Sequence, residues 1–416
     1  MTMTDSLTDT VTSGAATSAA DTPDASPGES QAIENRTVPA LPQAAIIGDS
    51  PADIWGMSSV ERLRRQLVRA GVTAVRSWSE APDPGTAPQI LLRADFVFDE
   101  VLVRDLVRAP GTLLLDPVSG EAVAAHVDAE NAPAVALVLL SGQALPEGQF
   151  PALRTVRPGE LSSDYNNALR KKEPPFLLRL TPETVPAIER RTFDGSYKGV
   201  TDLVTKYVWP RPAQAATKWC ALNAVTPNQV TTASAALVVL AFLSFWMGWF
   251  VIGLLFAWGM TFLDTVDGKL ARVTLTSSKW GNVFDHGIDL VHPPFWWWAW
   301  VVGLGAAGMP LGNEPLVLAI LVGGYVAQRL QEGLFLALFK IEIHIWRRFD
   351  SQFRLVTARR NPNLLLLTAF TLFGRPDLGM LAVTVWTAAS FLVHTAQILQ
   401  AFEAKRHGPV RSWLAP

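Results

Sequence analysis

The chain has 416 residues, of which 49 % are apolar and 17 % are charged. Its 35 basic residues are balanced by 37 acidic ones, so it lacks the excess positive charge that holds a protein on nucleic acid. Its one cysteine, Cys220, excludes an intramolecular disulfide framework and the usual cysteine-based zinc sites. A mean hydropathy of +0.22 and 15 tryptophans, most of them beyond residue 208, indicate a membrane protein.

The first 40 residues are small and polar, with scattered acids and no apolar periodicity. Such a segment cannot bury enough apolar surface to offset the entropy of ordering, so we expect residues 1–40 to be a disordered tail. It also lacks the basic start and apolar centre of a secretory signal. We therefore expect the domain that follows to stay in the cytosol.

Residues 41–191 have the pattern of a soluble α/β domain. The apolar run 44–47 predicts a buried strand, and 58–71 predicts a helix with a serine cap and a glycine stop. Alternating strands and helices favour a parallel, layered sheet. Further strands are expected at 90–92, 112–115 and 134–140.

The next segment, 192–225, interleaves lysine and arginine with tyrosine and tryptophan. This mixture is typical of an amphipathic juxtamembrane helix in the headgroup layer. From 229 to 263 no residue is charged, which is enough for two membrane crossings that meet at the Trp/Gly turn 246–249. Further crossings are predicted at 290–313, 315–339, 364–373 and 378–400.

The number of crossings is decided by the basic residues between them. Lys340 and five arginines from 347 to 360 lie between the fourth and fifth predicted spans, and other basic groups lie after the second and sixth. With six spans, all three groups face the cytosol, as the positive-inside rule requires. We therefore predict an all-α, six-helix membrane domain over 226–405 and a cytosolic tail over 406–416.

Four aspartates lie at the predicted cytosolic ends of the second and third spans. Asp264 and Asp267 are spaced i, i+3, and Asp285 and Asp289 are spaced i, i+4, so each pair lies on one face of its own helix. Four neighbouring carboxylates would repel one another unless hard divalent cations bind them, which points to Mg²⁺ or Mn²⁺. Carboxylates that hold two ions suit displacement at phosphorus.

Smaller and basic residues flank these aspartates. Gly268 and Gly281 carry no side chain, so a nucleotide could approach the backbone closely there. Arg272 follows Gly268 by four residues and can offer its planar guanidinium to a diphosphate. A solvated helix cap could explain one aspartate pair, but not four aspartates with glycine, alanine and arginine at fixed spacings between them.

The string D-x2-D-G-x2-A-R-x8-G-x3-D-x3-D resembles the signature of the CDP-alcohol phosphatidyltransferases. The resemblance implies a six-helix membrane enzyme that transfers a phosphoalcohol from a CDP-alcohol to a second hydroxyl and releases CMP. It implies metal binding by the four aspartates, with Asp289 also acting as general base. The positions that resemble nucleotide contacts are Gly268, Ala271, Arg272 and Gly281, and Asn228 resembles the start of the first span.

The same resemblance implies the partners. The donor would be CDP-diacylglycerol or a CDP-polyol, the acceptor an alcohol or a phospho-alcohol, and the cofactor two Mg²⁺ or Mn²⁺ ions. A homodimer in the plasma or inner membrane, active in phospholipid biosynthesis, is expected, with the site on the cytosolic side. A non-enzymatic cation transporter and a scaffold with a dead site are the rivals outside this class, and the full motif argues against both.

Each of two groups of charged residues has two alternative interpretations. Arg354, Arg359 and Arg360 either follow the positive-inside bias or form an anion site for a phosphorylated acceptor facing the aspartates. Arg329 and Glu332, inside the fourth predicted span, either stabilise the helix bundle as a polar pair or shape the acceptor pocket.

The soluble domain carries fragments, 55–65 and 92–99, that resemble pieces of a sugar-phosphate nucleotidyltransferase. Its fusion to the membrane domain resembles enzymes that join an inositol-phosphate cytidylyltransferase to a CDP-alcohol transferase. The expected Gly-x-Gly-x-Arg loop is replaced by Ile-Gly-Asp-Ser-Pro at 47–51, which lacks a basic residue for a triphosphate. We therefore favour a degenerate domain, with a bifunctional enzyme that makes its own CDP-alcohol as the alternative.

Overall fold

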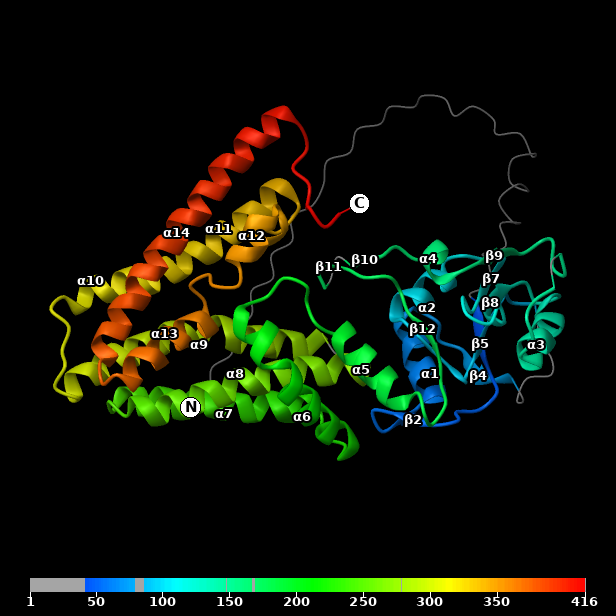
Figure 1. Ribbon diagram of the computed structural model, residues 1–416, viewed down its shortest axis with the longest axis horizontal. Helices are drawn as coiled ribbons and strands as arrows, with labels where there is room; N and C mark the ends of the chain where they lie inside the picture. The colour runs from blue at the N-terminus through cyan, green and yellow to red at the C-terminus, as the bar shows by residue number, and fades with distance from the viewer. Residues whose placement is uncertain (1–41, 79–85, 147, 167–168, 278, 416) are drawn as a thin grey trace, which may run out of the picture. The chain divides into compact units, whose positions relative to one another are not determined.

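The computed structural model describes residues 42–78, 86–146, 148–166, 169–277 and 279–415. The tail predicted at 1–40 lies outside the described residues. An N-terminal α/β region is followed by a C-terminal helical region (Figure 1).

The α/β region is built on a mixed six-stranded sheet. β1 is parallel to β4 and β5, whereas β8 is antiparallel to both β5 and β7. β7 is also parallel to β9, so the prediction of a parallel sheet holds except at β8. A short turn joins β7 to β8 and allows only an antiparallel pair there. The strands, in sheet order, are β4 Val75–Ser77, β1 Gln43–Ile47, β5 Gln89–Arg93, β8 Ala122–Val127, β7 Thr112–Leu115 and β9 Arg154–Val156.

Helices cover both faces of this sheet. Helix α1, Ser59–Arg69, begins as predicted, with the Ser58 hydroxyl accepting from the Glu61 N–H, and it packs beside α2, Glu100–Val107. The predicted strand at 134–140 is wrong: these residues belong to helix α3, Ala132–Ser141. A proline in its first turn and a left-handed glycine after its end favour the helix, which a short apolar run alone does not distinguish from a strand.

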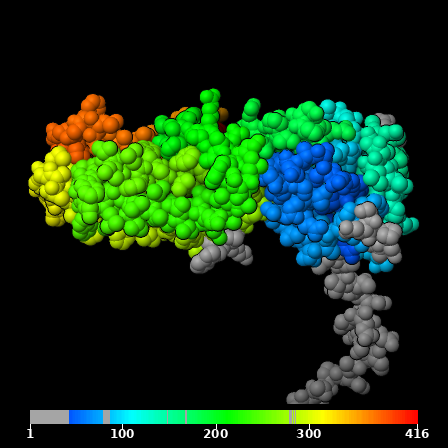
Figure 2. Space-filling view, turned by 90° about the horizontal axis from the view of Figure 1, so that it is seen from below, coloured from blue at the N-terminus to red at the C-terminus, as the bar shows by residue number. Residues whose placement is uncertain are grey.

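Smaller elements complete the α/β region and lead to the helical region. A π-helical turn η2, Val204–Val208, precedes helix α6, Pro210–Leu222, in the segment predicted to be juxtamembrane. The remaining elements are β2 Asp53–Ile54, β3 Met57–Ser58, β6 Phe96–Phe98, α4 Pro158–Leu161, β10 Tyr165–Asn166, β11 Lys171–Lys172, β12 Leu177–Arg179 and α5 Val185–Gly195. Figure 2 shows the green segment that contains α5 and α6 next to the blue start of the α/β region.

Three helices of the described residues are long and apolar enough to cross a membrane. They are α7 Pro227–Trp246, α8 Phe250–Val273 and α14 Pro376–His407. Helices also occupy the other predicted spans, but they are not among these three, and the count of six crossings stays a prediction. They are α9 Lys279–Ala306, α10 Glu314–Leu318 with its continuations η3 Ala319–Gly323 and α11 Gly324–Phe339, and α13 Arg360–Leu372.

Close packing sets the spacing between α7 and α9. An added Cβ at Gly303 of α9 would lie 1.8 Å from the Phe245 carbonyl oxygen of α7, so only glycine permits this approach. Trp296 and Trp300, fully buried, pack against Phe245 on the same side. Between α11 and α13 the chain forms η4, Ile343–Ile345, and α12, Arg348–Phe353.

Candidate active site

A cavity of about 660 Å³ collects most of the polar residues that the sequence singles out. It is lined by α8, α9, α11, the start of α13 and the segment before η2. Among its lining residues are Asp264, Gly268, Ala271, Arg272 and Asp289. These five predicted site residues therefore face one space, whereas Asp267 and Gly281 are not among the residues that line it.

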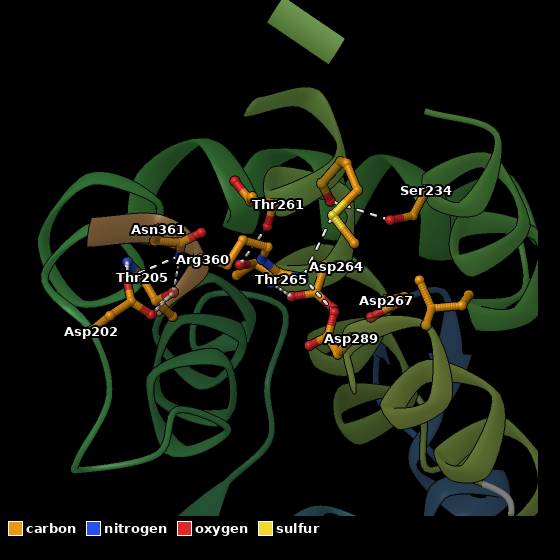
Figure 3. A network of polar contacts seen from close by, with 12 residues as sticks. Asp202, Thr205, Ser234, Thr261, Asp264, Thr265, Asp267, Asp289, Arg360 and Asn361 are labelled. Atoms are coloured by element: carbon orange, nitrogen blue, oxygen red, sulfur yellow. Dashed lines mark hydrogen bonds and ion pairs between the residues drawn. The ribbon is translucent and has the colours of Figure 1, made fainter. Parts of the chain in front are cut away.

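Asp264 and Asp289 come from different helices and meet at one guanidinium (Figure 3). Arg360 Nη2 lies 2.5 Å from Asp264 Oδ2, and Arg360 Nη1 donates to Asp289 Oδ1. Arg360 comes from the first turn of α13, far away in the sequence. Its charge offsets the repulsion between the two carboxylates.

Asp267, on α8 between Asp264 and Gly268, is 3 % exposed. The Thr231 hydroxyl of α7 donates to its Oδ2 at 2.6 Å. Its Oδ1 is buried and has no hydrogen-bond partner among the described residues. A buried carboxylate oxygen without a donor is costly, and a hard cation would satisfy it. The carboxylates present here therefore fit a divalent metal ion.

The remaining predicted positions are placed as follows. An added Cβ at Gly268 would lie 3.2 Å from Arg272 Nη2, so the absence of a side chain there leaves room for the guanidinium. Gly281 and Asp285 belong to α9, and the side chain of Asp285 lies outside the described residues. Asn228 lies in the first turn of α7.

A second polar network borders the cavity beside α11. Arg359 Nη2 donates to Glu332 Oε1 and lies 3.1 Å from His344 Nε2, while Arg329 Nη1 lies 3.2 Å from Glu332 Oε2. Burial lowers the pKa of His344 well below its usual value. Its Nε2 also lies 3.3 Å from Glu332 Oε1, so the ring tautomer decides whether this nitrogen accepts from Arg359 or donates to Glu332. The buried His394 ring lies 5.5 Å from that of His344.

Glu332, His344 and His394 place one ligand atom each within 4.8 Å of one another, which is close enough for a metal ion. The Arg359 guanidinium donates to Glu332 and lies within hydrogen-bond distance of His344. In the described arrangement Arg359 pairs with Glu332, so a cation bound here would compete with a guanidinium, just as a cation at Asp264 and Asp289 would compete with Arg360.

The segment before η2 supplies a third side of the cavity. Asn361 Nδ2 donates to Asp202 Oδ1 at 3.0 Å, next to Arg360, and Arg170 pairs with Glu342 at 2.6 Å. Burial, with help from the nearby charges of Arg170 and Arg272, lowers the pKa of Lys198. These contacts join residues far apart in sequence.

Sequence reasoning missed two of the closest contacts. Thr231 carries no signal of its own, because a threonine in an apolar helix usually bonds its own backbone. Asp202 lies in a segment interpreted only as juxtamembrane. One alternative for Arg354, Arg359 and Arg360 is an anion site that faces the aspartates, but the direct pairing of Arg360 with two of those aspartates depends on how α13 packs.

Residues 224–394 match the family model described as CDP-alcohol phosphatidyltransferase. The match covers the helical region with all four aspartates, supports membership of this region in that family, and supports an enzyme that acts on a CDP-alcohol with a divalent metal. It does not reach the α/β region, so the resemblance of that region to nucleotidyltransferases gains no support from it. No curated protein matches the chain.

Proposed function

We propose that the protein is a membrane-embedded transferase that moves a phosphoalcohol group from a CDP-alcohol to an acceptor hydroxyl and releases CMP in phospholipid biosynthesis. The observation that carries the proposal is the meeting of Asp264 and Asp289, from two helices, at one cationic group inside a cavity that Arg272 also lines. The protein would act as a homodimer in the plasma or inner membrane, with its cavity and α/β region on the cytosolic side.

Asp289 suits the role of general base. Its side chain is 39 % exposed, against 17 % for Asp264, and it lines the cavity from α9. In the proposed step, Asp289 takes the proton of the acceptor hydroxyl while that oxygen bonds to the phosphorus bearing the donor alcohol. The bond from this phosphorus to the bridging oxygen breaks, and CMP leaves with its electron pair.

The other positions would bind and orient the donor. Asp264, Asp267, Asp285 and Asp289 would hold two Mg²⁺ or Mn²⁺ ions, which supply positive charge to the diphosphate and to the leaving CMP. Arg272 would bind a phosphate through its planar guanidinium. Gly268, Ala271 and Gly281 would let the nucleotide approach the helix backbone.

One observation favours an acceptor that itself carries a phosphate. Arg354 lines the cavity, and its buried Nε and Nη1 have no hydrogen-bond partner among the described residues. A buried guanidinium with unused donors suits a phosphate oxygen better than a neutral alcohol. We therefore place phospho-alcohols ahead of simple alcohols as acceptors.

The experiment is a CMP-release assay on the purified full-length protein in lipid nanodiscs with Mg²⁺. CDP-diacylglycerol and CDP-polyols are tested as donors against a panel of alcohols and phospho-alcohols. Asp289→Asn and Asp267→Asn should each abolish CMP release. Asp377→Asn is the matched control, because Asp377 pairs with Arg375 at the other end of the helical region. Full activity in either site variant would overturn the proposed roles.

A further inference from the structure

The C-terminal end of α8 obtains part of its capping from another region of the chain. The last carbonyls of a helix have no partner within it and need donors from elsewhere. Here the Thr276 N–H donates to Ala271 O at 2.9 Å, and the Leu275 N–H donates to Arg272 O at 3.3 Å. These two bonds leave the carbonyls of Val273 and Thr274 to be satisfied.

Both remaining carbonyls accept from arginines of α1 in the α/β region. Arg62 Nη1 donates to Val273 O, and Arg65 Nη1 donates to Thr274 O, each at 2.8 Å. Arg62 is only 6 % exposed, so its bond is shielded from water. Cations at a helix C-terminus also interact favourably with the helix dipole.

The turn after α8 depends on such support. The two backbone bonds form the pattern in which a left-handed residue, usually glycine, follows the helix. This chain has Leu275 there, with φ +56°. A leucine in that conformation is strained, and such strain persists only where the surrounding structure holds it in place. Leu275 is 6 % exposed, which is consistent with a firmly held turn.

Side chains of both regions pack together beneath these bonds. Trp55 and Ile188 of the α/β region share one buried apolar cluster with Val266 and Leu270 of α8. Lys269, on the same turn of α8, donates to the Ser196 carbonyl at 3.2 Å. The end of α8 is therefore held by apolar contacts and by charged donors.

We propose that the α/β region serves as a positioning domain, in which Arg62 and Arg65 hold the last turn of α8 and the connection to α9. That turn carries Ala271 and Arg272, and the connection links the helices of Asp264 and Asp289. Arg62 and Arg65 are positioning residues, because they are not among the residues that line the cavity of about 660 Å³. An effect of these arginines on turnover of the CDP-alcohol rests on the proposed function, whereas their role in holding the end of α8 does not.

The first test is hydrogen–deuterium exchange on the full-length protein in nanodiscs, following the amides of residues 274–276. The double variant Arg62→Ala/Arg65→Ala should speed their exchange about tenfold, and Arg65→Ala alone, whose side chain is partly exposed, should have a smaller effect. Arg64→Ala is the matched control, because Arg64 lies on the same helix with a half-exposed side chain, and it should leave exchange unchanged.

Adding Leu275→Gly to the double variant should restore protection, because glycine adopts the left-handed conformation without strain. The KM for the CDP-alcohol should rise about tenfold in the double variant with kcat less affected, and Arg62→Lys/Arg65→Lys should recover part of it. Equal exchange in wild type and double variant, or equal acceleration by Arg64→Ala, would overturn the positioning role. An absence of CMP release in wild type would refute only the proposed function, because the exchange result would still decide this inference.

Discussion

Arg360 occupies the place between two carboxylates where a cation is needed, and its removal gives a sharp prediction. Its guanidinium pairs with Asp264 and Asp289, and its side chain is only 14 % exposed. A divalent ion bound to these carboxylates competes with this guanidinium. Arg360→Gln removes the competitor, so the variant should bind Mn²⁺ more tightly than wild type while losing turnover.

The magnitude follows from the more buried pair. Asp264 is 17 % exposed, and two unit charges about 4 Å apart attract by about 4 kcal/mol at an effective dielectric constant of 20. The attraction between Arg360 and Asp289 adds little, because water screens the charge of a side chain that is 39 % exposed. A displaced Arg360 regains most of this energy from water and other partners, so the net value lies near the low end of the range for charged hydrogen bonds, about 1.4 kcal/mol, which is about tenfold in the dissociation constant.

The assay is a titration of the nucleotide-free protein with Mn²⁺, in which the free ion is measured by electron paramagnetic resonance. Arg375→Gln is the control, because Arg375 pairs with an aspartate in an exposed position away from the cavity. We expect about tenfold tighter binding in Arg360→Gln and no change in the control. Unchanged or weaker Mn²⁺ binding in Arg360→Gln would refute the competition and would separate Arg360 from the metal site.

Three further predictions address other contacts. Thr231→Val removes the hydroxyl that donates to Asp267 Oδ2 and should weaken Mn²⁺ binding several-fold. Thr232→Val, at the neighbouring exposed residue, should leave Mn²⁺ binding unchanged, and equal effects of the two variants would contradict a role of Thr231 in orienting Asp267. Because the pKa of Lys198 is lowered, this residue loses its positive charge at a pH below 10.5, and CMP binding should weaken as the pH rises through that value. Lys198→Arg, which stays charged, should flatten the decline. Identical pH profiles would exclude Lys198 from CMP binding. The full-length protein should release no pyrophosphate from CTP with any sugar phosphate or inositol phosphate, and release would favour the bifunctional alternative.

The parts of the fold that follow from local pattern were predictable. Helix α1 has its serine cap and its glycine stop in the sequence, and the Trp/Gly turn correctly separates α7 from α8. Segment 134–140 was mistaken for a strand, because an apolar run of that length fits either state. The strand β8 was missed, since its alanines give little strand signal.

The site could be predicted only where spacing along one helix determines it. The i, i+3 spacing of Asp264 and Asp267 needs no knowledge of packing. In contrast, the contact of Arg360 with the aspartates and that of Arg62 with α8 join residues about 100 or 200 positions apart. Only the arrangement of whole helices brings such residues together, and one sequence contains no periodicity that reports it.

The short helix α13 acquires a role in this arrangement. Its 13 residues rise only about 20 Å, less than the roughly 30 Å of a bilayer core, so α13 alone does not reach across it. Its first turn carries Arg360, which lines the cavity, while the preceding Arg359 pairs with Glu332 of α11. Consecutive residues at a helix start point in different directions, so one turn can join the carboxylates of α8 and α9 to the network of α11.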